Sequence, residues 1–219
     1  LDRSEYSVDK AARFENVLDI LSRAGVSVLW RDNNSGCKGV CARVATEDLS
    51  HGTAAGLCSG EECFDEVLLS GLPDRLRLAA SDTLVVLHQK GSHGPAYYKR
   101  HPGNFRVFEP ECTSGSPESC ANGDIVNGYD NTILYTDYFL HRTIDLLKRN
   151  SDAYDTLLIY FSDHGESLGE NGIYLHGLPY FLAPDEQTHV PLIVWMSNGY
   201  AAHRHIDLHC LDAQRHANK

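Results

Sequence analysis

The run Leu157-Leu158-Ile159-Tyr160-Phe161-Ser162-Asp163-His164-Gly165-Glu166-Ser167 decides the fold class of this 219-residue chain. Five large apolar residues in succession are typical of a buried strand. A carboxylate and an imidazole follow where that strand ends, and ligand sites of open α/β sheets lie at the carboxyl ends of the strands. The run therefore predicts a sheet-edge site that contains Asp163 and His164.

Composition places the chain among ordinary folded proteins. It is 42% hydrophobic and 22% charged, and it is long enough to bury a sizeable core as one domain, residues 1–219. Its formal net charge of −11 argues against a nucleic-acid-binding surface, which needs clustered Lys and Arg. Neither a membrane span nor the order of a signal peptide is present in the sequence.

Further segments alternate between helix and strand. We expect strands at 26–30, 83–87, 157–161 and 190–195, and helices at 8–24, 61–80 with an interruption at 71–73, and 121–149. Short, continuously apolar strands between helices predict an α/β fold with a mostly parallel sheet and helices on both faces. Residues 197–219 lack apolar periodicity, and we expect a frayed end there.

Polar residues follow three of these strands. Asn34 and Lys38 come after the first, His93 after the second, and Asp163 and His164 after the third. Carboxyl ends of parallel strands share one edge, so these groups should converge. The turn Glu170-Asn171-Gly172 predicts a hairpin that returns His176 toward Asp163.

Asp163 and His164 form a candidate zinc site. Adjacent strand residues point to opposite faces, so both reach one ion only if the chain bends, which Gly165 permits. Aspartate oxygen and histidine nitrogen are ordinary Zn²⁺ ligands. The alternative is a turn capped by Asp163 with an ordinary polar histidine.

The other polar groups suit a phosphate. His93 and His176 stand beside glycines and can donate to a phosphoryl oxygen or act as general acids, although a lone histidine is more often structural. Asn34 and Lys38 suit an anionic phosphate, and the alternative for Lys38 is a solvated surface lysine. Glu166 is a candidate for orienting a metal-bound group.

Six of the seven cysteines form three close pairs. The gaps within the pairs hold three, four and seven residues, which departs from zinc-ribbon spacing and favours local disulfides: Cys37 with Cys41, Cys58 with Cys63, and Cys112 with Cys120. Such disulfides imply an oxidising compartment, the periplasm or the cell exterior. Free buried thiols are the alternative, and Cys210 is left over.

Several blocks together resemble the lipid A phosphoethanolamine transferases, which include the mobile colistin-resistance enzymes. The blocks are Trp30 to Asn34 with Lys38, His88 to Tyr98, Tyr160 to Gly172, and Tyr174 to Gly177. The resemblance runs from about residue 10 to residue 212 and includes the cysteine pairs.

This resemblance implies an alkaline-phosphatase-like periplasmic catalytic domain at the inner membrane. The family transfers phosphoethanolamine from phosphatidylethanolamine to lipid A through a threonine nucleophile, with zinc. By likeness, Asp163 and His164 match zinc ligands, His93 and His176 match histidines at the phosphoryl group or a second zinc, and Asn34 and Lys38 match the donor pocket. Zinc would lower the threonine pKa and offset phosphoryl charge.

The resemblance also implies that parts of the family's chain precede and follow this one. The threonine, a glutamate ligand and the membrane helices match positions upstream of Leu1, and a carboxyl-terminal segment matches positions after Lys219. We therefore expect a truncated domain that is inactive alone and binds zinc weakly. The alternatives are a sulfatase or phosphoglycerol transferase of the same superfamily, or a non-catalytic, disulfide-containing periplasmic domain.

Overall fold

A parallel sheet organises the computed structural model, which describes residues 6–59 and 62–214. Its strands lie in the order β2-β1-β5, with β1 spanning Ser27–Asp32, β2 Ala45–Asp48 and β5 Thr83–His88. Asp32 is paired in register with Asp48 on one side and His88 on the other. The three strands therefore end at the same level, as predicted for β1 and β5, whereas β2 was not among the expected strands.

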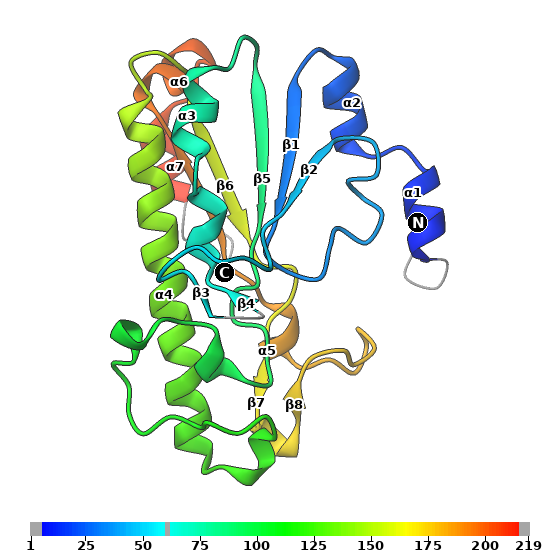
Figure 1. The fold of residues 1–219 in the computed structure, drawn as a ribbon, viewed down its shortest axis with the longest axis vertical. Helices are drawn as coiled ribbons and strands as arrows, with labels where there is room; N and C mark the ends of the chain where they lie inside the picture. The colour runs from blue at the N-terminus through cyan, green and yellow to red at the C-terminus, as the bar shows by residue number, and fades with distance from the viewer. Residues whose placement is uncertain (1–5, 60–61, 215–219) are drawn as a thin grey trace.

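The strand β6 (Leu157–Phe161) runs beside β5 in the same direction, toward the end of the molecule that holds β7 and β8 (Figure 1). The strand expected at 190–195 is β9 (Leu192–Met196), and it pairs antiparallel with β6. The connection between them, residues 162–191, holds a short hairpin and the four-residue helix α5 (Asp185–Thr188). The strands β2-β1-β5 form one parallel sheet, and β6 and β9 form a separate antiparallel pair. The expected α/β fold with a parallel sheet is confirmed.

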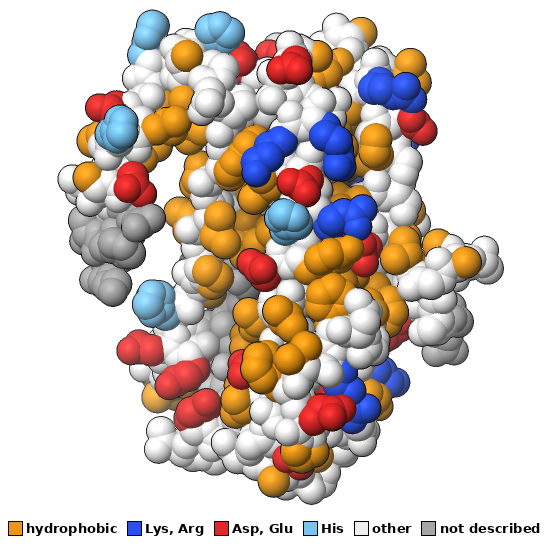
Figure 2. Space-filling view, turned by 90° about the vertical axis from the view of Figure 1, so that its left-hand side faces the viewer, with side chains coloured by type: hydrophobic (Ala, Val, Ile, Leu, Met, Phe, Trp, Pro, Cys, Tyr) orange, Lys and Arg blue, Asp and Glu red, His pale blue; other side chains and the backbone are white. Residues whose placement is uncertain are grey.

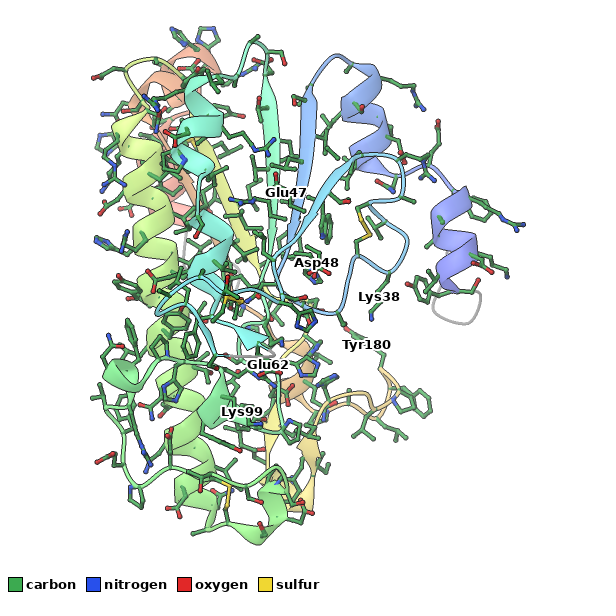
Figure 3. All side chains as sticks on the ribbon, in the orientation of Figure 1. Lys38, Glu47, Asp48, Glu62, Lys99 and Tyr180 are labelled. Atoms are coloured by element: carbon green, nitrogen blue, oxygen red, sulfur yellow. A yellow bond between two sulfur atoms is a disulfide. The ribbon has the colours of Figure 1, made fainter. Side chains whose placement is uncertain are left out.

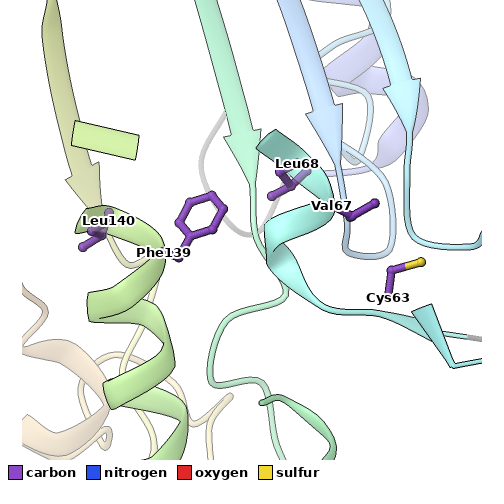
Figure 4. Packing of buried hydrophobic residues seen from close by; sticks show 5 residues of the cluster. All are labelled: Cys63, Val67, Leu68, Phe139 and Leu140. Carbon is purple, nitrogen blue, oxygen red and sulfur yellow. The ribbon is translucent and has the colours of Figure 1, made fainter. Parts of the chain in front are cut away.

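The long helix α4 (Asn122–Arg149) confirms the helix expected at 121–149. Figure 4 shows how it meets the short 3₁₀ helix η1 (Asp65–Leu69) beside the strands. Their contact is a cluster of buried apolar side chains: Cys63, Val67, Leu68, Phe139 and Leu140. Each of the Val, Leu and Phe side chains in this cluster contributes roughly 1.5–3 kcal/mol by leaving water. This cluster anchors α4 against the end of the sheet where the polar loops emerge.

The amino-terminal segment is two helices rather than the single helix expected at 8–24. They are α1 (Val8–Arg13) and α2 (Val17–Arg23). Asn16 starts the second helix, because its side chain accepts a hydrogen bond from Leu18 N and its own N–H donates to Asp19. This capping box overrides the apolar periodicity that joins the two segments in the sequence.

The segment expected to be helical at 61–80 is also divided. Its first residue lies outside the described residues, Glu62–Cys63 forms strand β4 against β3 (Cys58–Ser59), and helices occupy η1 and α3 (Leu72–Arg77). Gly71 has a φ of 69° at the break, a conformation that glycine adopts easily. A disulfide joins Cys58 of β3 to Cys63 of β4.

The expected frayed end is wrong for residues 197–214. Two helices, α6 (Asn198–His203) and α7 (Leu208–Gln214), lie there, and the rest of the predicted tail falls outside the described residues. Ser197 accepts a hydrogen bond from Tyr200 N, and Ala201 is buried. One serine cap and one small buried residue give this segment little apolar periodicity, so its helices are not evident from the sequence.

The three expected disulfides are confirmed, joining Cys37 to Cys41, Cys58 to Cys63 and Cys112 to Cys120. Cys210 is free and exposed. On the face shown in Figure 2, Lys and Arg side chains are interspersed with acidic and hydrophobic ones. Among the described residues, no helix has the length and apolar character needed to cross a bilayer.

Candidate active site

Three histidines from separate loops meet at the carboxyl ends of β5 and β6. The ring centroids of His164 and His176 lie 3.8 Å apart, and those of His93 and His176 lie 5.6 Å apart. Glu166 joins them, since one ligand atom of each of His164, Glu166 and His176 lies within 4.8 Å of the others. The predicted convergence is confirmed for the histidines.

A bend after β6 brings His164 into this cluster. Gly165 N donates to Gln187 O across 3.0 Å, and a Cβ at residue 165 would overlap the carbonyl oxygen of Glu186. Only glycine therefore allows the chain to pass this close to α5. The bend leaves Asp163 Oδ1 3.8 Å from His164 Nε2, although the Asp163 side chain is 85% exposed.

The predicted hairpin returns His176 to the cluster. Strands β7 (Ser167–Leu168) and β8 (Tyr174–Leu175) pair antiparallel around the turn η5 (Glu170–Gly172). His176 follows β8, and its Nδ1 lies 2.7 Å from Glu166 Oε1. The turn thus sets the distance between Glu166 and His176, which are ten positions apart in the sequence.

The histidines share one tautomer. His93 Nδ1 lies 2.7 Å from Gly94 O, and His164 Nδ1 lies 2.8 Å from Gly165 O. A carbonyl oxygen only accepts, so each Nδ1 carries a proton and Nε2 is the ring nitrogen left to contact a ligand. The same logic applies to His176 beside Glu166, which makes Nε2 the nitrogen available to a ligand on all three rings.

Glu166 is held in place by a buried tyrosine. Tyr97 OH donates to Glu166 Oε2 across 3.1 Å, while Glu166 Oε1 faces His176. Burial and the neighbouring Glu166 carboxylate raise the pKa of Tyr97, so the phenol stays protonated and remains a donor. Both carboxylate oxygens are therefore fixed, and Glu166 orients His176.

A buried aspartate fixes the loop that carries His93. Asp65 accepts hydrogen bonds from Lys90 N and Gly91 N, each 2.9 Å, and from Asn33 Nδ2 at 2.7 Å. Burial raises the pKa of Asp65. The residue ties the end of β1 to the loop after β5. Sequence reasoning missed it because an acid at the start of a short helix reads as an ordinary first-turn residue.

Asn34 and Lys38 occupy the loop after β1. Asn34 Nδ2 donates to Gln89 O at 3.3 Å, which links this loop to the one that carries His93. Lys38 has a φ of 49°, and its Nζ donates to Ser35 Oγ at 2.9 Å. The disulfide between Cys37 and Cys41 closes the loop around Lys38. The donor-pocket role of the two residues stays a prediction.

The donor set fits a zinc ion. Zn²⁺ takes histidine nitrogen and carboxylate oxygen, and its histidine ligands usually donate their other N–H to a carboxylate or a carbonyl. The histidines here do so, with Glu166, Gly94 O and Gly165 O as the acceptors. Within the part of the chain that the structure describes, the group with ligand atoms close enough to share one ion is His164, Glu166 and His176. Asp163 lies outside this group, and its role as a zinc ligand beside His164 stays a prediction.

Comparison with known proteins identifies the family. Residues 1–216 match the family model described as Sulfatase. The chain belongs to the sulfatase family. Within that family it is 47% identical over 211 residues to phosphoethanolamine transferase EptA of Salmonella typhimurium, and 46% identical over 202 residues to phosphatidylethanolamine transferase Mcr-1 of Escherichia coli.

Solved structures agree with the sulfatase-family assignment. The soluble domain of lipooligosaccharide phosphoethanolamine transferase A from Neisseria meningitidis superposes with a TM-score of 0.90 at 43% identity, covering 98% of this chain and 64% of that one. The C-terminal periplasmic domain of EptC from Campylobacter jejuni gives 0.79 at 44% identity, covering 94% and 63%. The predicted resemblance to this group is confirmed.

The matches cover most of this chain but less than half of each relative. The Salmonella match spans 96% of this chain but 39% of that protein, and the Mcr-1 match spans 89% and 37%. The chain therefore spans about two fifths of the length of these curated relatives.

Proposed function

We propose that the protein carrying this chain transfers phosphoethanolamine from phosphatidylethanolamine to lipid A with the help of zinc. The observation that supports this most directly is the convergence of His93, His164 and His176 in a chain so similar to named phosphoethanolamine transferases. We propose a location at the periplasmic face of the inner membrane, which agrees with three disulfides and with relatives solved as periplasmic domains.

Each residue has a defined task in this proposal. Asp163 and His164 hold the ion, which when bound offsets the charge of the transferring phosphoryl group. His93 and His176, in their protonated forms, donate from Nε2 to phosphoryl oxygens. Glu166 orients the His176 ring, because its Oε1 lies 2.7 Å from His176 Nδ1.

The loop after β1 supplies the donor pocket. Lys38 brings an ammonium group and Asn34 an amide, both suited to a phosphate. The disulfide and the hydrogen bond to Gln89 hold the two residues in fixed positions relative to the sheet. This part of the proposal predicts effects on donor binding rather than on the chemical step.

The experiment is transfer by the full-length protein in the membrane, with modified lipid A detected by mass spectrometry. His176→Ala should lower the rate by about 10²–10⁴-fold, the range of a lost general acid or base. His141→Ala is the matched control, because that ring lies on the exposed face of α4 and pairs with Asp145 four residues on.

Equal rates for His176→Ala and His141→Ala would refute the assignment. Transfer of sulfate or phosphoglycerol without any phosphoethanolamine product would instead favour another reaction of the same family. Zinc removal by a chelator that leaves the rate unchanged would remove the metal from the proposal.

A further inference from the structure

A protruding turn beside the histidine cluster carries three consecutive exposed apolar side chains. Tyr180, Phe181 and Leu182 are 82%, 83% and 60% exposed. We name residues 180–182 the apolar tip. Soluble proteins scatter single exposed apolar residues over their surfaces, but a contiguous group usually marks an interaction site.

The apolar tip is held as an ordered turn. Leu182 N and Ala183 N both donate to Pro179 O, at 2.8 and 2.9 Å. Its two flanks are tied to the active site, since His176 meets Glu166 and Gln187 Nε2 donates to Ser167 Oγ at 2.9 Å. The tip is therefore presented at a fixed place next to the cluster.

The chemistry of the segment selects a bilayer as the partner. Residues 177–184 contain no charged side chain, only glycine, proline, alanine, leucine and the two aromatics. Aromatic side chains favour the membrane–water interface, where an apolar ring meets a polar boundary. A convex turn can be surrounded by lipid on all sides, whereas a protein partner would need a matching concave pocket.

The surroundings agree with this orientation. Figure 3 shows Lys38 and Tyr180 on the same side of the molecule. A lysine there can meet lipid phosphates while the tip enters the acyl region. We propose that the apolar tip inserts into the phospholipid surface and so sets the histidine cluster at the height of the donor headgroup. This inference rests on the proposed function, because only a lipid-borne substrate requires the site to meet a bilayer.

The test uses a tryptophan at the tip and vesicles of phosphatidylethanolamine and phosphatidylglycerol. Phe181→Trp should show a blue shift of emission on adding vesicles, and bromine-labelled acyl chains should quench it. The matched control is Leu78→Trp, because Leu78 is 84% exposed just after α3, near the amino-terminal end of β5. Its emission should not change.

Insertion should also depend on the apolar side chains. Adding Tyr180→Ser and Leu182→Ser to Phe181→Trp should weaken vesicle partitioning at least about tenfold, the scale of exposing buried apolar side chains. The vesicle measurement does not depend on the transfer assay described above. Insertion without transfer would therefore refute the proposed function alone, and transfer without insertion would refute this inference alone.

Three results would overturn the inference. One is an unchanged emission of Phe181→Trp with vesicles, and another is an equal shift in Leu78→Trp. The third is an emission already blue-shifted without lipid, in the chain or the full-length protein, because a second copy or another segment would then cover the tip.

Discussion

The end of β1 and the loop after β6 use their carboxylates in opposite ways. After β1, Asp32 is surrounded by donors: Trp30 Nε1 and His88 Nδ1 reach its Oδ2, and Asn34 N reaches its Oδ1, all at 2.8 Å. After β6, Glu166 is shared between one tyrosine and one histidine of a cluster. The Asp32 carboxylate holds neighbouring backbone and side-chain donors together, whereas the Glu166 carboxylate orients His176, whose Nε2 is available to a ligand.

The electrostatics follow this difference. Burial alone would raise the pKa of Asp32, but the hydrogen bonds from His88, Trp30 and Asn34 outweigh it and lower the pKa. The histidines near Glu166 instead keep each Nε2 for a ligand. The comparison teaches that a polar sheet edge is divided between residues that hold the edge together and residues that present donors to a ligand.

The largest expected effect comes from the bend that builds the β6 side. Gly165→Ala forces a Cβ onto the Glu186 backbone, which cannot move aside as a flexible side chain would. We expect a loss of about 2–4 kcal/mol in the free energy of unfolding, measured by urea denaturation, together with loss of zinc binding. Gly103→Ala is the control, since a Cβ there meets nothing within 4 Å. Equal stability of the two variants would break the account of the bend.

A smaller effect is expected from Glu166→Gln, which keeps the shape of the side chain but removes its charge. Orienting partners of metal-bound histidines are typically worth 10–100-fold in metal affinity, and we expect a loss of about that size. Calorimetric titration with zinc measures it, with the exposed Glu118→Gln as control. An unchanged affinity would mean that Glu166 serves only the fold.

Asp32→Asn tests the β1 side. The amide replaces an acceptor with a donor, so we expect a loss of about 1–2 kcal/mol at neutral pH and unchanged zinc affinity. The sign of the pH dependence follows from the lowered pKa of Asp32. The ionised Asp32 stabilises the native state at pH values above its unfolded-state pKa of about 3.9. This stabilisation disappears as the pH falls through the lowered folded-state pKa.

The stability gap between the native protein and Asp32→Asn should therefore close in acid. Denaturation curves measured from neutral pH down to strongly acidic solution check this. A gap that widens on acidification would contradict the assignment of Asp32 as an ionised, hydrogen-bonded group. A loss of zinc affinity in Asp32→Asn would break the comparison itself.

The smallest effect on stability is expected from Lys38→Ala, because within residues 6–59 and 62–214 its Nζ has hydrogen bonds only to the exposed Ser35. We expect a change within about 0.5 kcal/mol. If Lys38 binds the donor phosphate, the KM for the donor should rise several-fold in the full-length protein with little change in kcat. An unchanged KM would leave Lys38 as a solvated lysine.

Sequence reasoning reached the parts of the site that are fixed by topology. Apolar runs located β1, β5 and β6, and the loops after β5 and β6 carry His93 and His164, which both contact the His176 ring. The Glu170–Gly172 turn located His176 for the same reason, because a hairpin sets the separation of its ends.

Sequence reasoning missed the site residues whose positions depend on tertiary contacts. Tyr97 reaches Glu166 from 69 positions away, and Asp65 reaches Lys90 from 25. The break between α1 and α2 was missed for a different reason, because a local capping box at Asn16 and Asp19 is not recorded by apolar periodicity.

Anomalous diffraction at the zinc edge tests the central claim most directly. In crystals of this chain grown with zinc, we predict one peak within coordination distance of His164 Nε2 and Asp163, beside His176. An internal control for adventitious zinc is the exposed pair His203 and Asp155, whose Nδ1 and Oδ2 atoms lie 2.6 Å apart. A peak at that pair with none at the histidine cluster would contradict the account.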